Sequence, residues 1–258
     1  SVEGNLFETL TAQLSWQRVT LNRGLFPTDG ASTVLSVSST IPGSDLSYYR
    51  LNVRQRYYQP LTNDLVFGFQ GELGYLDAYG DTKEVPFFQN FYAGGPRSLR
   101  GFESNTLGPR STDAPCYEFN YSEGICPNLL DSDGDGELDT PYYNPYANQT
   151  SRYRDAPIGG NIKVEGSLQL IFRLPFIEDQ RSLRSAFFFD FGNVFSDNCK
   201  DYQINCYKPA IDDLRYSYGV GITWITGFGP MSLAIAKPTN AGPRERTEEF
   251  QFTVGNVF

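Results

Sequence analysis

The sequence predicts an all-β fold, specifically a transmembrane antiparallel up-and-down β-barrel, and three observations predict it. Apolar and polar residues alternate with a period of two, and no helical period competes with this pattern. Most of the alternating segments have ten or more residues, which is enough to cross a bilayer at a tilt. Aromatic residues make up 15% of the chain although its mean hydropathy is −0.39. A barrel with an apolar lipid face and a polar lumen combines all three features.

Nine segments carry the alternation. In Ile162 to Phe172 every second residue is apolar, apart from Gly166, and the residues between them are polar up to Gln169. The same pattern spans Leu214 to Trp224. A soluble β-sandwich would also alternate, but its strands are shorter, and its polar faces seldom carry a run such as Arg50, Asn52, Arg54 and Arg56. The predicted strands are 6–20, 31–41, 46–60, 64–79, 161–174, 182–195, 212–226, 229–237 and 246–258.

The connections between these strands are unequal. Some are short turns, such as Pro60 to Asn63 and Gly227-Phe228, whereas residues 80–160 form one long extracellular or lumenal loop. Short turns at one rim and long loops at the other are typical of outer-membrane barrels. Nine is an odd number, and an unpaired strand edge is unfavourable in lipid. Residues 1–258 are therefore expected to form one partial barrel domain.

Composition argues against several classes of function. The net charge is −9 without a basic cluster, which argues against a nucleic-acid partner. The sequence contains no run of about 18 apolar residues, so no membrane helix is predicted. The chain has no histidine, nucleophile elbow or phosphate loop, so a non-enzymatic function is expected. It opens at Ser1-Val2-Glu3 without an apolar leader, and we expect that it was processed or truncated.

The four cysteines form two close pairs, Cys116 with Cys126 and Cys199 with Cys206, in polar, turn-rich segments. Two such pairs favour disulfides in an oxidising compartment. A zinc site is the competing interpretation, but the sequence has no CxxC spacing and no histidine.

An acidic run in the long loop fits a structural Ca²⁺ site. Carboxylates at alternate positions followed by a glycine are a calcium-loop pattern, but the twelfth position is Tyr142, where an EF-hand has glutamate. An acidic solvated loop tip is the alternative, and no cofactor is required in either case. The candidate ligands are Asp131, Asp133, Asp135, Glu137 (through its backbone carbonyl) and Asp139.

Residues 90–109 are the most specific stretch of the chain, with Leu99-Arg100-Gly101-Phe102 at their centre. This stretch resembles the loop signature of the BamA family of outer-membrane insertases. Further pieces agree in order: Arg23 to Gly30, Ile41 to Ser44, Gly159 to Asn161 and Gly229-Pro230. The resemblance covers essentially the whole chain. It implies the last nine strands of a sixteen-stranded barrel, which periplasmic POTRA domains would precede.

The resemblance also implies a loop anchor inside the barrel. In the family a loop arginine, here Arg100, lies against acidic residues on two later strands. One acid matches Asp190, whose side chain the pleat directs away from Phe189. The second family acid falls at Gln169, which is a departure. Either Glu165 on the same strand face replaces it, or the site keeps one carboxylate; anchoring itself could be the loop's whole role.

The last strand carries a second resemblance. It alternates and ends on an aromatic residue, as does the signal that barrel proteins present to their assembly machinery, and a terminal aromatic is also simply an interfacial anchor. In the family this strand pairs weakly with the first strand to form a lateral gate, which templates incoming strands. The matching residues are Phe250, Phe252, Val254, Gly255 and Phe258.

The resemblance implies an outer-membrane protein assembly factor. Its partners would be the lipid bilayer, unfolded outer-membrane proteins and the periplasmic lipoproteins of an assembly complex, and it would reside in the cell outer membrane. Two alternatives stay open. One is a translocation pore of the same superfamily, either a two-partner secretion transporter or a TamA-like protein, and the other is a passive porin.

Overall fold

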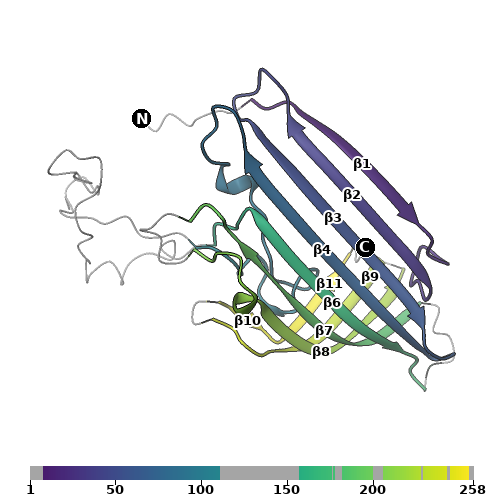
Figure 1. The fold of residues 1–258 in the computed structure, drawn as a ribbon. Coiled ribbons are helices and arrows are strands. Elements are labelled where there is room, and N and C mark those ends of the chain that lie inside the picture. Colours follow the sequence, from purple (N-terminus) through teal and green to yellow (C-terminus); the bar gives the residue numbers. More distant parts are fainter. Residues whose placement is uncertain are drawn as a thin grey trace, which may run out of the picture.

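The fold is one curved antiparallel sheet of nine strands, in the order β1-β2-β3-β4-β6-β7-β8-β9-β11 (Figure 1). The computed structural model describes residues 8–110, 157–175, 177, 182–199, 206–227, 229–242 and 245–255. The strands of the sheet are β1 (Thr11–Val19), β2 (Gly30–Thr40), β3 (Tyr48–Pro60), β4 (Leu65–Ala78), β6 (Ile162–Phe172), β7 (Leu183–Phe195), β8 (Arg215–Thr226), β9 (Gly229–Pro238) and β11 (Phe250–Val254).

The predicted all-β antiparallel fold and its nine strands are confirmed, with two differences at strand ends. The segment predicted as one strand over 246–258 is divided: β10 (Thr247–Glu248) pairs with β5 (Gly101–Phe102) instead of β9, and only β11 joins the sheet. The segment predicted over 212–226 begins with the 3₁₀ helix η3 (Ile211–Asp213). The backbone of β10 therefore pairs with the long loop, through β5, and not with the neighbouring strand β9.

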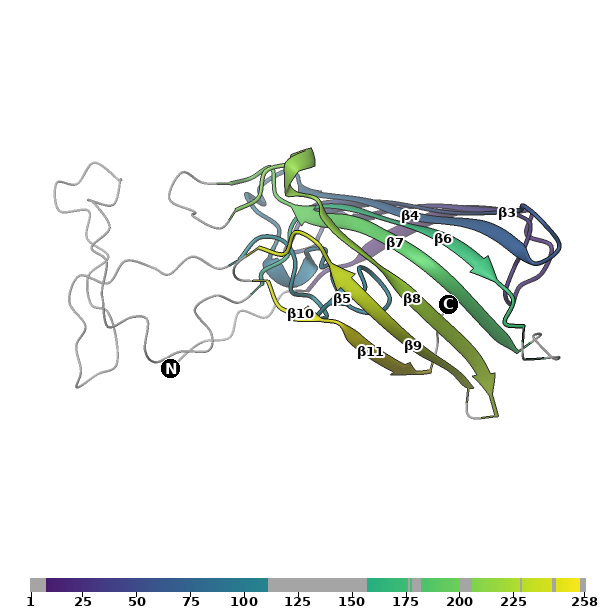
Figure 2. The same ribbon diagram turned by 90° about the horizontal axis from the view of Figure 1, so that it is seen from below.

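The sheet bends into an open trough, and Figure 2 shows the loop that carries β5 inside its curve. Strands β1 and β11 are the two edges, and within the described residues each pairs with one neighbour only. Strands β3 and β4 pair residue for residue from Tyr48–Ala78 to Pro60–Val66. Because the register is unbroken there, alternate residues of the neighbouring strands line the same face.

The convex face is apolar and exposed. Trp16, Leu73, Phe187, Trp224 and Phe252 are each at least 53% exposed. A contiguous apolar surface of this extent is unfavourable in water and suits contact with lipid. No helix in the described residues is long and apolar enough to cross a membrane.

The concave face is polar along the middle of the strands and holds an apolar core near the long-loop end. Leu99, Phe102 and Leu107 of the loop are fully buried there, against Leu76 of β4 and Val194 of β7. The loop enters through the 3₁₀ helix η1 (Phe87–Gln89). The core thus forms between the sheet and its longest connection, and it fixes the loop inside the trough.

Candidate functional site

The loop reaches the sheet through backbone conformations that only glycine adopts easily. Gly94 has a φ of 102°, and a Cβ atom there would lie 2.5 Å from the carbonyl oxygen of Glu103. Gly101 has a φ of 89°, and its Cβ would lie 3.2 Å from that of Ala236 on β9. The glycine of the Leu99–Phe102 motif therefore allows the loop backbone to approach the strand.

Arg100 makes the central polar contact of the concave face. Its Nε donates a hydrogen bond to Oδ2 of Asp190 at 2.7 Å, and its Nη2 donates to Oδ1 at 2.7 Å. Its backbone N–H donates to the same Oδ2 at 3.2 Å. Ser167 on β6 donates to Oδ1 at 2.6 Å and accepts a bond from Arg100 Nη2 at 3.0 Å. This two-pronged pairing is the geometry in which a guanidinium binds a carboxylate most strongly.

The carboxylate of this pair is buried, and its surroundings fit the stacked guanidinium. Asp190 is fully buried, and the Arg100 side chain is 17% exposed. The guanidinium carbon of Arg100 lies 3.4 Å from the centre of the Phe188 ring, which adds a cation–π contact. A Cβ atom at Gly219 would lie 2.7 Å from that ring. The small residues of β8 therefore leave room for the stacked ring and guanidinium.

Among the residues that the structure describes, Arg100 contacts one carboxylate and not two. Glu165 accepts a hydrogen bond from Ser98 of the loop and forms an ion pair with Lys163 at 2.9 Å. Gln169, at the position of the second family acid, donates to Ser167 at 3.3 Å. Glu165 therefore holds the loop through Ser98, two residues before the arginine, and does not substitute as the arginine's partner.

Gln251 of β11 fastens the same loop from the other side. Its Nε2 donates to the Phe102 carbonyl at 2.8 Å, and its Oε1 accepts from the Gly101 N–H at 3.4 Å. The β5–β10 pairing and the bond from Glu103 N–H to the Arg246 carbonyl at 3.0 Å extend this contact. Sequence reasoning missed Gln251, Ser167 and Phe188; alternation places all three on the inward face, but it does not identify their partners.

Tyr92 precedes the glycines of the loop. Its hydroxyl donates to the Phe87 carbonyl at 3.2 Å. Burial raises the pKa of Tyr92 above its ordinary value, because a phenolate would lose hydration there. The hydroxyl therefore keeps its proton, and with it this hydrogen bond, across the neutral pH range.

The residues assigned to the terminal strand point mainly outward. Phe250, Phe252 and Val254 are 57%, 53% and 56% exposed on the convex face, and Gly255 has a φ of 108°. Over the described part of the chain, strand β11 has five residues, fewer than the other strands of the nine-stranded sheet. Phe258 lies outside the described residues.

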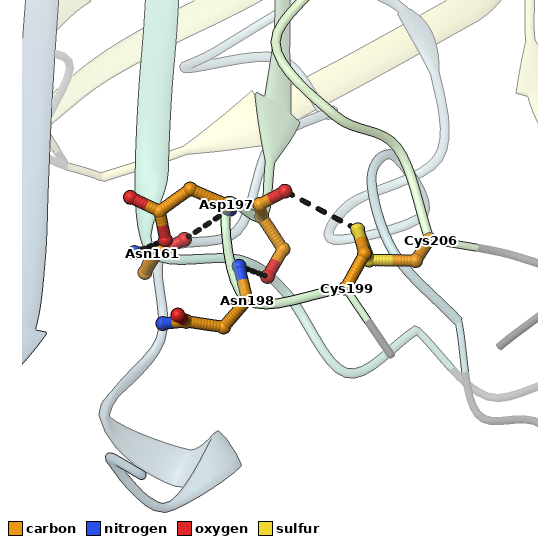
Figure 3. Close-up of a disulfide and its surroundings, with 6 residues drawn as sticks. Asn161, Asp197, Asn198, Cys199 and Cys206 are labelled. Atoms are coloured by element: carbon orange, nitrogen blue, oxygen red, sulfur yellow. Dashed lines mark hydrogen bonds between the residues drawn. A yellow bond between two sulfur atoms is a disulfide. The ribbon is translucent and has the colours of Figure 1, made fainter. Parts of the chain in front are cut away.

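The disulfide between Cys199 and Cys206 is confirmed, with a Cα–Cα distance of 5.7 Å (Figure 3). It closes the β7–β8 connection beside a polar cluster that Figure 3 also shows. There, Asn161 donates to Asp197 Oδ1 at 2.6 Å and accepts from the Asp197 N–H at 3.2 Å. The pair Cys116 and Cys126 and the proposed calcium ligands Asp131, Asp133, Asp135, Glu137 and Asp139 lie outside the described residues.

Comparison with known proteins identifies the family. The model of the Omp85 superfamily domain matches residues 2–258. The chain belongs to the Omp85 superfamily. It is 31% identical to the outer membrane protein assembly factor BamA of Neisseria meningitidis, over 95% of this chain and 28% of that protein. The human sorting and assembly machinery component 50 homolog is 26% identical, over 78% of this chain and 35% of that protein.

A solved structure extends the likeness to the fold. The crystal structure of BamA from Haemophilus ducreyi lacking POTRA domains 1–3 superposes with a TM-score of 0.70 at 31% identity. The match covers 95% of this chain and 41% of that one. The chain therefore spans less than half of the relatives it matches. Omp85 proteins of this kind are outer-membrane β-barrels, and this chain is part of such a barrel.

Proposed function

We propose that the protein to which this chain belongs folds and inserts β-barrel proteins into the outer membrane. The likeness to an outer membrane protein assembly factor over 95% of the chain is the observation that carries this proposal. The loop anchored at Arg100 supports it, because an assembly factor must present the edge of a sheet while keeping its interior fixed. The proposed activity makes and breaks no covalent bond.

The proposed mechanism uses the terminal strand as a gate. A five-residue β11 offers few hydrogen bonds at the seam where the barrel closes, so the seam opens at low cost. An opened edge presents backbone donors and acceptors that pair with an incoming strand. Arg100, Asp190 and Gln251 hold the concave side of the terminal strands in place while the seam exchanges partners.

The proposal includes further partners. Unfolded outer-membrane proteins are the substrates, the bilayer is the medium, and periplasmic lipoproteins of an assembly complex deliver or support them. Calcium bound by the acidic run of the long loop would stabilise the external surface. A translocation pore of the same superfamily and a passive porin are the alternative functions. A passive porin would show a steady conductance without barrel assembly, and the number of upstream POTRA domains would distinguish a translocation pore.

The test uses the full-length protein in proteoliposomes, supplied with an unfolded barrel protein. Wild-type protein is expected to speed the appearance of the folded, heat-modifiable band, and Arg100→Ala is expected to slow it several-fold. Arg173→Ala is the matched control, because Arg173 pairs with Asp64 in an exposed position outside the trough. Steady, ungated conductance with no acceleration of folding by the wild-type protein would overturn the proposal.

A further inference from the structure

The short-turn end of the concave face contains a cavity whose charge is opposite to that of the chain. The chain has a net charge of −9. The cavity, of about 400 Å³, is nevertheless lined by five arginines and two glutamates. The arginines are Arg54, Arg56, Arg97, Arg100 and Arg184, and the glutamates are Glu72 and Glu165.

Both glutamates are already paired, and so are two of the arginines. Glu72 forms an ion pair with Arg54 at 3.2 Å, and Glu165 pairs with Lys163 at 2.9 Å. Arg100 is neutralised by Asp190. Within the described part of the chain, the other three arginines of the cavity, Arg56, Arg97 and Arg184, have no carboxylate within ion-pair distance.

Arg184 is the most constrained of these three. Its guanidinium carbon lies 4.8 Å from the centre of the Tyr58 ring and 5.9 Å from that of Phe26. One of its nitrogens, Nη2, is buried without a hydrogen-bond partner among the described residues. Arg23 and Arg56 lie near enough to add their positive charge to its surroundings. A half-buried charge without a counter-ion is costly, and nearby charges of the same sign increase that cost.

One of the two aromatic residues beside Arg184 is held in a costly backbone conformation. Phe26, in the β1–β2 connection, has a φ of 47°, a region that residues other than glycine seldom occupy. Such conformations persist where the surrounding structure enforces them, often at binding sites. Here the conformation places an aromatic ring beside the guanidinium, so the cavity combines positive charge with apolar walls.

We propose that this cavity binds a carboxylate of a polypeptide segment from outside this chain, with Arg56, Arg97 and Arg184 as its anion-binding residues. A guanidinium matches a carboxylate in shape. The bound carboxylate would supply the negative charge that these three arginines lack. The rings of Phe26 and Tyr58 suit an apolar side chain next to the acid. The segment would come from an unfolded substrate protein, and only this part of the inference rests on the proposed function.

The test measures peptide binding to the full-length protein in detergent micelles by fluorescence anisotropy. The probe is a labelled extended peptide with one glutamate between two phenylalanines, and its counterpart carries glutamine at the same position. The glutamate peptide is expected to bind about tenfold more tightly than the glutamine peptide, a difference of about 1.4 kcal/mol. Its affinity is expected to fall as salt is added.

Two substitutions test the residues. Arg184→Gln should weaken binding of the glutamate peptide about tenfold. Arg97→Gln should also weaken it; Arg97 is exposed, so its replacement leaves the fold intact even if the Arg184 variant does not fold. Arg173→Gln, at the same end but paired with Asp64 outside the cavity, should bind like wild type.

Equal affinity for the two peptides, or unchanged affinity in folded Arg97→Gln, would overturn the inference. Inorganic phosphate binding in the cavity without any binding of the glutamate peptide would overturn it too. Because no folding assay is involved, this result is independent of the insertion experiment. Loss of peptide binding with normal insertion would reject this site alone, and the reverse outcome would reject the proposed function alone.

Discussion

Arg100 and Arg184 both lie on the concave face, but the protein neutralises only one of them. Arg100 comes from a loop and meets a fully buried carboxylate at two points. Arg184 comes from strand β7 itself and meets two aromatic rings and no carboxylate within the described residues. The difference separates two uses of the same side chain. The first arginine fixes a segment of the chain in place, whereas the second retains charge available for a partner.

Removing the carboxylate should affect the protein most. Asp190→Ala leaves Arg100 without its partner, and breaking a largely buried pair costs about 3–5 kcal/mol. The midpoint of thermal unfolding of the full-length protein should fall, and the loop should become sensitive to protease. Asp64→Ala, which breaks an exposed pair with Arg173, should change the free energy of unfolding by less than about 1 kcal/mol. Equal losses in the two variants would contradict the comparison.

Replacing Gln251 should have an intermediate effect. Gln251→Leu leaves the Gly101 N–H and the Phe102 carbonyl without their buried partner, at a cost of about 1–3 kcal/mol. Urea unfolding and loop proteolysis would measure it. Thr253→Val, at the next inward position of β11, serves as the matched control. Unchanged protease resistance in Gln251→Leu would show that Gln251 contributes little to holding the loop.

Replacing Arg184 should have the smallest effect on stability. This result would distinguish Arg184 from Arg100 most clearly. Arg184→Met removes an unpaired charge, which is favourable, and a cation–π contact, which is worth about 0.5–1 kcal/mol. The two contributions oppose each other, so the free energy of unfolding should change by less than about 1 kcal/mol. A loss as large as that of Asp190→Ala would show that Arg184 has a structural counter-ion.

The sequence predicts the strands well because their signal is local. Alternation places Asp190 inward and its phenylalanine neighbours outward, and the structure has that arrangement. The same alternation puts Glu165 on the inward face, but four residues along a strand is far enough to bring it to Ser98 instead of Arg100. Alternation defines the face of a side chain and leaves open which segment packs opposite it.

The contacts of the loop with β10 and β11 could not be predicted for the same reason. Thr247 and Glu248 come just before the alternating segment Phe250 to Val254, so their position in the chain assigns them to the same strand. In the structure they pair with Gly101 and Phe102, whose sequence carries no strand signal of its own. The loop and the neighbouring strand compete for pairing with these residues. The outcome depends on tertiary contacts, which the local sequence does not reveal.

The bond between Gly101 and Gln251 joins residues 150 positions apart, and this separation sets an order of events. Hairpins such as β3–β4 and β8–β9 close over short turns, so they form early, whereas distant contacts form late because more chain entropy is lost in closing them. Arg100 can meet Asp190 only after β7 has folded, and Gly101 meets Gln251 only after β11 is in place. A loop that makes both contacts therefore marks a chain whose terminal strand has already joined the sheet.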